Sequence, residues 1–167
     1  MTKKNHRKRN KAIVIISKTL GTGVIICTIL LLLALTLPRL LGFDTYNVLT
    51  GSMEPEISVG SLILVKYRNP EEIKVGDVIA YSQNDVVVCH RIIENNISSG
   101  KLTTKGDAND NPDPVVVDYS NVIGLVEYHI PTLGLIGTYI SSLSGKLLVV
   151  EILVVASLLN IIADRLK

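Results

Sequence analysis

Aromatic residues are scarce in this chain of 167 residues, and tryptophan is absent. Aromatic residues make up only 4% of the sequence and hydrophobic residues 47%, so Leu, Ile and Val carry the apolar content. Lysine and arginine crowd the first dozen residues, with no aromatic residue among them. Surfaces that bind nucleic acid combine basic residues with stacking aromatics, so we expect no nucleic-acid partner. The net charge of +2 does not by itself indicate a partner.

Cysteine and histidine are equally sparse. Cys27 lies in a long apolar segment and Cys89 in a β-rich run, so these two cysteines are not expected to meet in a disulfide. The histidines are scattered at His6, His90 and His129 and lack the paired spacing of a zinc site. We therefore expect no metal and no other cofactor.

Two long apolar segments dominate the remaining composition. Residues 19–38 carry no charge, which meets the threshold of about 18 residues for a membrane-spanning helix. Residues 147–163 are apolar apart from Glu151 and a few small polar residues, close to the short limit of such a span. Glu151 is expected about one turn into this helix, near enough to the outer surface for its carboxylate to reach water. The sequence thus predicts two transmembrane helices.

Basic residues predict the orientation of these helices. Lysine and arginine are concentrated in residues 1–18, and two more lie in residues 164–167. Because positive flanks stay on the cytoplasmic side, both tails are expected in the cytoplasm and the middle of the chain outside it. We expect a multi-pass protein of the cytoplasmic membrane, or of the endoplasmic-reticulum membrane in a eukaryote. A cleaved secretory signal is the alternative, but its apolar region runs about 7 to 15 residues, so the longer segment here favours a retained anchor.

Residues 42–130 have a different pattern, in which short β-rich runs alternate with turn residues. This spacing predicts an extracytoplasmic domain built on an antiparallel sheet. Residues 58–65 and 74–81 each place a glycine turn before a strand. Residues 131–146 are punctuated by glycine and are expected to form a partly helical or irregular connector. The predicted strands are Tyr46–Leu49, Leu62–Tyr67, Asp77–Tyr81, Val86–Ile93, Lys101–Thr104 and Val122–Val126. The predicted fold class is therefore mainly β, with an α-helix on each side.

A candidate nucleophile follows the first apolar segment. Ser52 lies in the run Thr50-Gly51-Ser52-Met53-Glu54-Pro55. Gly-Ser pairs are abundant in turns, so the serine alone is a weak indication. Gly51 is expected to permit a backbone conformation closed to other residues, and Pro55 to stiffen the turn. Such a turn would project the Ser52 hydroxyl while the Ser52 N–H and the Thr50 hydroxyl face a developing oxyanion.

A serine hydroxyl needs a base within hydrogen-bond reach to act as a nucleophile. His90 closes a run of valines, and strand alternation puts it on the face of Val88 and Arg91 on the opposite face. A histidine sheltered there suits general base catalysis near neutral pH. The alternative is a structural histidine at the end of a strand, hydrogen-bonded to a neighbouring residue. Arg91 is expected to be a surface or ion-pair residue.

A carboxylate-rich loop supplies candidates for the group that orients the base. Asp107 and Asp113 lie in a stretch with two prolines, and either aspartate could serve. Such sequences also form turns through local side-chain bonding. A calcium loop is a further alternative, because Asp107, Asn109 and Asn111 alternate as oxygen ligands would. The glycine and terminal glutamate of such loops are missing, however.

Together these stretches resemble the type I signal peptidases, and within them the endoplasmic-reticulum-type branch of eukaryotes, archaea and some Gram-positive bacteria. The match covers about residues 48–131. The resemblance implies a β-rich catalytic domain of the kind shared with LexA-like repressors. It also implies a membrane-bound serine endopeptidase that removes signal peptides from secretory preproteins, after small residues, on the outer membrane face. The matching motifs, in order, are Gly51-Ser52-Met53-Glu54-Pro55, Val59-Gly60-Ser61-Leu62, Val75-Gly76-Asp77-Val78, His90-Arg91-Ile92 and Lys105-Gly106-Asp107-Ala108-Asn109.

The resemblance also assigns roles. It implies Ser52 as nucleophile, His90 as general base in place of the lysine of bacterial-type enzymes, and an aspartate that orients His90. Asp113 is the preferred direct partner, and Asp107 a supporting residue. Met53 and Ile57 are expected to dip toward membrane lipid.

Two other interpretations keep the same fold. A catalytically silent membrane scaffold would retain the domain, but its serine would not react with a serine-directed probe. A self-cleaving repressor is disfavoured because two membrane spans are predicted and no DNA-binding segment is apparent.

Overall fold

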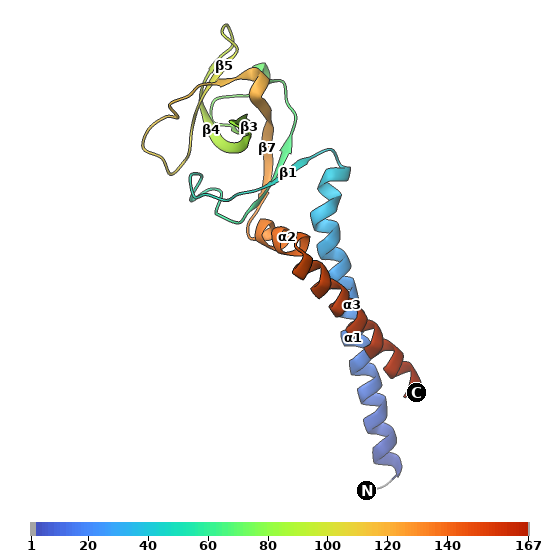
Figure 1. The fold of residues 1–167 in the computed structure, drawn as a ribbon. Coiled ribbons are helices and arrows are strands. Elements are labelled where there is room, and N and C mark those ends of the chain that lie inside the picture. The colour runs from blue at the N-terminus through green and yellow to red at the C-terminus, as the bar shows by residue number, and fades with distance from the viewer. Residues whose placement is uncertain (1–2, 167) are drawn as a thin grey trace. The chain divides into compact units, whose positions relative to one another are not determined.

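The computed structural model describes residues 3–166, with side chains from residue 11 onward. The chain divides into two compact units, a helical unit formed by its two ends and a β-rich unit, Leu37–Thr138 (Figure 1). Among the basic residues assigned to the cytoplasmic tails, Lys167 and the side chains of residues 3–10 lie outside the described part of the chain.

Both predicted spans are helical, but each helix is longer than its apolar segment. Helix α1 runs over Lys3–Leu40, so the backbone of the basic tail continues the helix. Helix α3 runs over Leu143–Arg165, and Ser142 is its N-cap. The Ser142 hydroxyl accepts a hydrogen bond from the Gly145 N–H at 3.1 Å. Glu151 is therefore the ninth residue of α3, about two turns in rather than one. Lys11–Leu40 and Leu143–Arg165 are long and apolar enough to cross a membrane.

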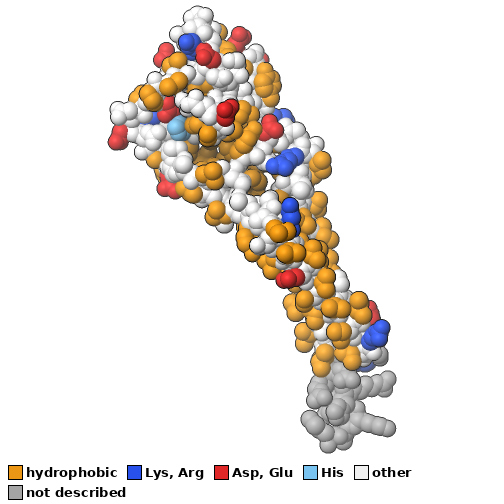
Figure 2. Space-filling model, viewed as in Figure 1, with side chains coloured by type: hydrophobic (Ala, Val, Ile, Leu, Met, Phe, Trp, Pro, Cys, Tyr) orange, Lys and Arg blue, Asp and Glu red, His pale blue; other side chains and the backbone are white. Residues whose placement is uncertain are grey.

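Most of the described side chains of these helices are exposed. Hydrophobic side chains cover the visible face of the described helical segments (Figure 2). Within the helical unit, α1 and α3 pack closely at Gly21, where an added Cβ would lie 2.7 Å from the Ala156 carbonyl oxygen. Lys18 Nζ and Asp164 Oδ1 form an ion pair of 2.5 Å between the same helices. The connector is helical as well, because α2 spans Leu133–Ser141.

The β-rich unit is built on a seven-stranded sheet in the order β1-β2-β7-β3-β4-β5-β6, and every pair in it is antiparallel. The predicted fold class, mainly β with two apolar helices, is confirmed. Each predicted strand overlaps an observed one, although β1 begins and ends two residues earlier than predicted. Strand β6, which the sequence does not predict, is only two residues long. The strands are β1 Asp44–Asn47, β2 Leu62–Lys66, β3 Val78–Gln83, β4 Val86–Asn96, β5 Lys101–Lys105, β6 Val117–Asp118 and β7 Val122–Ile130, with 3₁₀ turns at Pro70–Glu72 and Tyr119–Asn121.

Turn residues set the strand boundaries as the sequence suggests. Gly60 and Gly76 have φ values of +83° and +98° ahead of β2 and β3, a conformation that glycine adopts without steric cost. Asn84 and Asp85 form the two-residue β3–β4 connection with φ values of 49° and 63°. Positive φ at both central residues is the geometry of a tight hairpin turn, and it fixes the register of β3 against β4.

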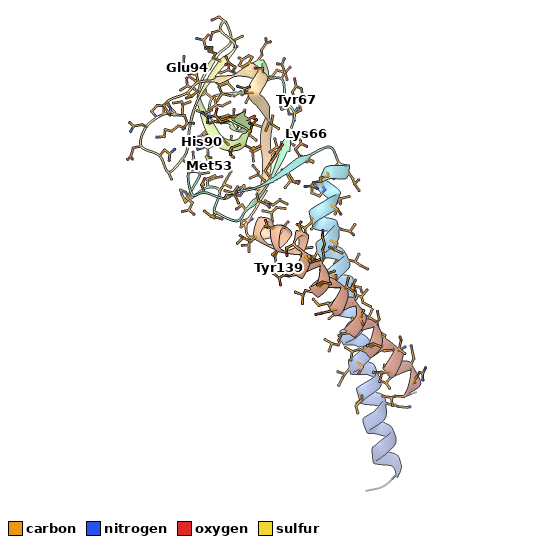
Figure 3. All side chains as sticks on the ribbon, viewed as in Figure 1. Met53, Lys66, Tyr67, His90, Glu94 and Tyr139 are labelled. Atoms are coloured by element: carbon orange, nitrogen blue, oxygen red, sulfur yellow. The ribbon has the colours of Figure 1, made fainter. Side chains whose placement is uncertain are left out.

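Strand alternation divides the core between the two faces of the sheet. Ile79 and Tyr81 face one hydrophobic cluster, whereas Ala80 between them faces the other. Met53 and Ile57 belong to the second cluster and are only 1% and 2% exposed. The expectation that they dip toward lipid is therefore wrong, because they anchor their loop in the core of the domain. Met53 and His90 both lie within this domain (Figure 3).

Candidate active site

Ser52 lies on the long loop between β1 and β2. Backbone bonds close the loop at its base, from Val48 N to Ser61 O at 2.9 Å and from Gly60 N to Val48 O at 2.8 Å. A further bond, from Ala108 N to Ser52 O at 2.9 Å, ties the serine itself to the carboxylate-rich loop between β5 and β6, residues 106–116, called the acidic loop below. Together with burial of Met53, these bonds hold the Ser52 backbone at a defined place beside the sheet.

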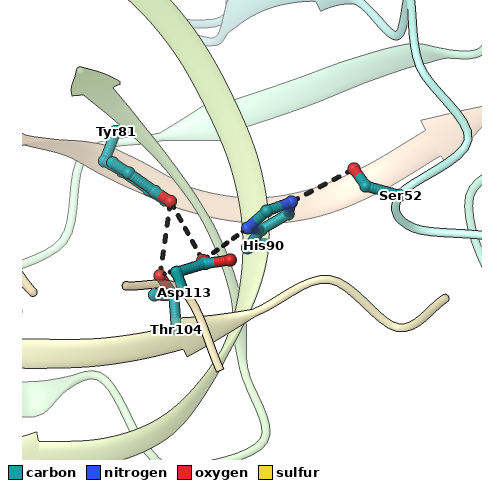
Figure 4. A network of polar contacts seen from close by, with 5 residues as sticks. All are labelled: Ser52, Tyr81, His90, Thr104 and Asp113. Atoms are coloured by element: carbon teal, nitrogen blue, oxygen red, sulfur yellow. Dashed lines mark hydrogen bonds and ion pairs between the residues drawn. The ribbon is translucent and has the colours of Figure 1, made fainter. Parts of the chain in front are cut away.

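His90 lies in the middle of β4, opposite Ile79 of β3, and is 8% exposed. Its Nε2 lies 3.1 Å from Ser52 Oγ, and its Nδ1 lies 2.6 Å from Asp113 Oδ2 (Figure 4). The two ring nitrogens thus contact a hydroxyl and a carboxylate on opposite sides. With Nδ1–H donating to Asp113, Nε2 is left to accept the Ser52 proton, which is the tautomer that a general base needs.

The carboxylate of Asp113 has further partners. Thr104 Oγ1 donates to Asp113 Oδ2 at 2.7 Å, and Tyr81 OH donates to the same oxygen at 3.3 Å. The Asp113 N–H donates to Thr104 O at 2.8 Å, which fixes the backbone as well. Burial is the largest cause that raises the pKa of Tyr81 to about 12, so its hydroxyl stays protonated and remains a donor at physiological pH.

Asp107, the other candidate carboxylate, contacts Arg91 and not His90. Arg91 Nε donates to Asp107 Oδ1 at 2.8 Å and Arg91 Nη2 to Oδ2 at 2.6 Å, a bidentate pair. Arg91 Nη1 also donates to Gly76 O at 2.7 Å. The hydrogen bond to Asp107 is the largest cause that raises the pKa of Arg91. Since both Asp107 oxygens are held by the guanidinium, the residue anchors the acidic loop to β4.

The structure corrects one expectation about the serine turn. Gly51 is not in the left-handed region, and a Cβ added there would meet only the Glu54 side chain, at 3.4 Å from Cδ. The conformational reason for this glycine is therefore wrong. Thr50 is exposed, and within residues 3–166 its hydroxyl and the Ser52 N–H form no hydrogen bond.

Gly106, in the acidic loop, has a clear steric requirement. A Cβ there would lie 2.6 Å from Ser52 O and 2.8 Å from Asn109 Nδ2. Only glycine lets the acidic loop approach the nucleophile's backbone so closely. The sequence motif contained this residue, but its contact with Ser52 joins segments far apart in the chain.

Sequence reasoning also missed Tyr81 and Thr104. The register pairs Tyr81 with Val88 and Thr104 with Ile92, which puts both on the face of His90. A tyrosine and a threonine in neighbouring strands are ordinary β-sheet residues, so only the register reveals that they reach one carboxylate.

Comparison with known proteins agrees with this geometry. The family described as signal peptidase, peptidase S26, matches residues 21–111, more than half of the chain. The chain belongs to this family. The match includes Ser52, His90 and Asp107 and ends just before Asp113.

Relatives within the signal peptidases come from bacteria and fungi. Signal peptidase I W of Bacillus subtilis (strain 168) is 38% identical over 112 residues, covering 59% of this chain and 59% of the relative. The signal peptidase complex catalytic subunit SEC11 of Lachancea thermotolerans is 36% identical over 108 residues, covering 56% and 64%. SEC11 of Zygosaccharomyces rouxii is 32% identical over 127 residues, covering 68% and 75%. The matches to the first two relatives thus span about three fifths of their length. These relatives confirm the predicted endoplasmic-reticulum-type branch.

Proposed function

We propose that this chain is a type I signal peptidase, a membrane-bound serine endopeptidase that removes N-terminal signal peptides from secretory preproteins. The observation that carries the proposal is the chain of contacts from Ser52 through His90 to Asp113 in a domain of this family. Nucleophile, base and orienting carboxylate in hydrogen-bond contact are the arrangement that acyl transfer requires.

The first half of the reaction forms an acyl-enzyme. Ser52 Oγ attacks the scissile carbonyl carbon while its proton passes to His90 Nε2, and the Asp113 carboxylate stabilises the imidazolium through Nδ1–H. The Ser52 N–H and the exposed Thr50 hydroxyl are the donors proposed for the oxyanion. As the C–N bond breaks, His90 gives its proton to the leaving amine, which is the new N-terminus of the mature protein. The signal peptide remains as an ester on Ser52.

The second half reverses the proton movements. A water molecule gives a proton to His90 Nε2 and attacks the ester carbon. The bond to Ser52 Oγ then breaks, and His90 returns the proton to the serine. The signal peptide leaves with a free carboxylate. The proposed proton transfers involve only Ser52, His90, water and the leaving amine of the substrate.

The two apolar helices support a placement on the outer face of the membrane. A cleavage site reaches that surface while the apolar part of a signal peptide is still in the bilayer, so anchoring the domain there brings it to its substrate. With both basic tails in the cytoplasm, residues 42–130 are extracytoplasmic. Secretory signals end in small side chains of the A-x-A type, which is the expected specificity.

The proposal is tested with the purified full chain in liposomes and one precursor that carries a signal peptide. N-terminal sequencing of the product should show cleavage after a small residue. Ser52→Ala and His90→Ala should each lower kcat by about 10⁴-fold or more while remaining in the membrane. Ser120→Ala, at an exposed serine, is the matched control and should cleave normally. Processing by Ser52→Ala at the normal rate would exclude the proposed chemistry. No processing by any form, with no Ser52 labelling by a fluorophosphonate, would identify a silent scaffold.

A further inference from the structure

One oxygen of Asp113 accepts from three side chains on three different strands. His90 Nδ1 of β4 lies 2.6 Å from Oδ2, Thr104 Oγ1 of β5 lies 2.7 Å from it, and Tyr81 OH of β3 lies 3.3 Å from it. Figure 4 shows Tyr81 and Thr104 on the side of Asp113 away from Ser52. The carboxylate is therefore held between the base and a pair of hydroxyls.

Asp113 needs such support because it lies on a loop. The segment between β5 and β6 has no regular secondary structure around Asp113, and this residue is flanked by Pro112 and Pro114. Its backbone is tied to β5 by the bond from its N–H to Thr104 O, but that bond does not fix the rotation of its side chain. A second contact to the carboxylate is what selects one rotamer.

The two hydroxyls are suited to donate rather than to accept. Thr104 is 0% exposed, so its hydroxyl must find a partner within the protein. It also lies 3.3 Å from Tyr81 OH, but its single proton goes to the closer Asp113 oxygen. Burial is the largest cause that raises the pKa of Tyr81 to about 12, and the charge of Asp113 acts in the same direction. The phenol thus remains a donor across any pH at which a peptidase is assayed.

We propose that Thr104 and Tyr81 are positioning residues that hold the Asp113 carboxylate against His90 Nδ1, with Thr104 the stronger of the two. The inference rests on the proposed function of the same site. Both residues lie on the side of Asp113 away from Ser52, so they are expected to act on the chemical step and not on binding. The titratable groups facing this pair are Asp113 and His90, whose ring centroid lies 6.5 Å from that of Tyr81. The Cys89 thiol lies on the opposite face of the sheet, although its charge also bears on the Tyr81 pKa.

The test uses the full chain in liposomes and measures kcat, KM and the pH dependence of kcat/KM for a precursor. Thr104→Val removes the hydroxyl at nearly constant volume, Thr104→Ser restores it, and Tyr81→Phe removes the weaker donor. Thr103→Val is the matched control, because Thr103 neighbours Thr104 on β5 but pairs with Glu94 and has no bond to Asp113. Thermal unfolding of each variant checks that it is folded.

Thr104→Val should lower kcat about 10-fold with KM within twofold, because misplaced catalytic groups slow the chemical step. Thr104→Ser should recover most of that loss, and Tyr81→Phe should lower kcat about threefold. In Thr104→Val the acidic limb of the pH profile should move to lower pH, because a mobile Asp113 stabilises the protonated base less. Thr103→Val should match the unmodified chain.

Three results would overturn the inference while leaving the proposed function intact: Thr104→Val as active as Thr103→Val, a loss confined to KM, or an acidic limb that moves to higher pH. If Thr104→Val does not fold, the kcat values of Thr104→Ser and Tyr81→Phe test the positioning role. A folded Tyr81→Phe with unchanged kcat, together with an impaired Thr104→Ser, would then count against it. Failure of the proposed function is a separate result, namely normal cleavage by Ser52→Ala.

Discussion

Replacing Gly106 with alanine should damage the site although every side chain assigned to the chemistry is kept. The added Cβ would lie 2.6 Å from Ser52 O, whereas ordinary contact begins at 3.4 Å, so the two loops must separate by about 0.8 Å. The carbonyl that moves belongs to the nucleophile itself. That movement would also stretch the 2.9 Å bond from Ala108 N to Ser52 O.

The expected loss of activity follows from the distance between the nucleophile and its base. Ser52 Oγ is 3.1 Å from His90 Nε2, so a shift approaching 0.8 Å takes the pair beyond hydrogen-bond range. A misplacement of about 1 Å costs on the order of 100-fold in rate, so we expect Gly106→Ala to lower kcat by about 10- to 100-fold. Overpacking should also reduce the free energy of unfolding by about 1–3 kcal/mol.

The assay is precursor cleavage in liposomes, run below the unfolding temperature of the variant so that lost stability is not read as lost rate. Gly23→Ala is the control, because a Cβ there meets nothing within 4 Å. Adding Asn109→Ala to Gly106→Ala removes the second clash, at 2.8 Å from Asn109 Nδ2, but should not restore activity, since the contact with the Ser52 carbonyl remains. Cleavage by Gly106→Ala within twofold of the unmodified rate would show that the added Cβ does not displace Ser52 from His90.

Four further predictions concern groups around the site. Asp113→Asn should lower kcat about 10³-fold or more, because the neutral amide no longer stabilises the protonated base. Asp107→Asn should lower kcat only about 10-fold. Equal losses of kcat in the cleavage assay would contradict the separate roles of the two aspartates. Arg91→Leu and Asp107→Asn should show a coupling energy of about 1 kcal/mol in a double-mutant cycle of unfolding, since the bidentate pair is partly exposed at 33% and 18%; a value near zero would show that the pair does not anchor the loop. Burial raises the pKa of Cys89 from 9.0 to about 12, so at pH 8 iodoacetamide should alkylate it far more slowly in the folded chain than in the denatured one, measured by mass spectrometry in a Cys27→Ser background. Because the pKa of Cys89 is higher in the folded chain than in the unfolded one, the free energy of unfolding is unaffected by the ionisation of this thiol below pH 9 and falls as the pH rises toward 12. Between pH 9 and 12 the Tm of Cys89→Ala should therefore fall less than the Tm of the unmodified chain.

The choice between the two carboxylates shows where sequence reasoning stops. Asp107 and Asp113 are six residues apart on one loop, and local rules give both the same turn-forming and acceptor properties. Only the folded loop shows that Arg91 holds Asp107 while His90 contacts Asp113. The same holds for Tyr81 and Thr104, whose place beside Asp113 depends on the pairing of β3, β4 and β5.

Local sequence patterns were enough to predict the two apolar helices, the run of short strands and the glycine turns at Gly60 and Gly76. These features depend on hydropathy, side-chain alternation and allowed backbone angles, all of which act between near neighbours in the chain. The tertiary structure alone decided that Met53 is buried in the core and that Gly106 lies against Ser52. It also decided which aspartate reaches His90. Each of these results depends on strand register and loop packing between residues distant in sequence, where displacements of less than 1 Å determine whether a hydrogen bond forms.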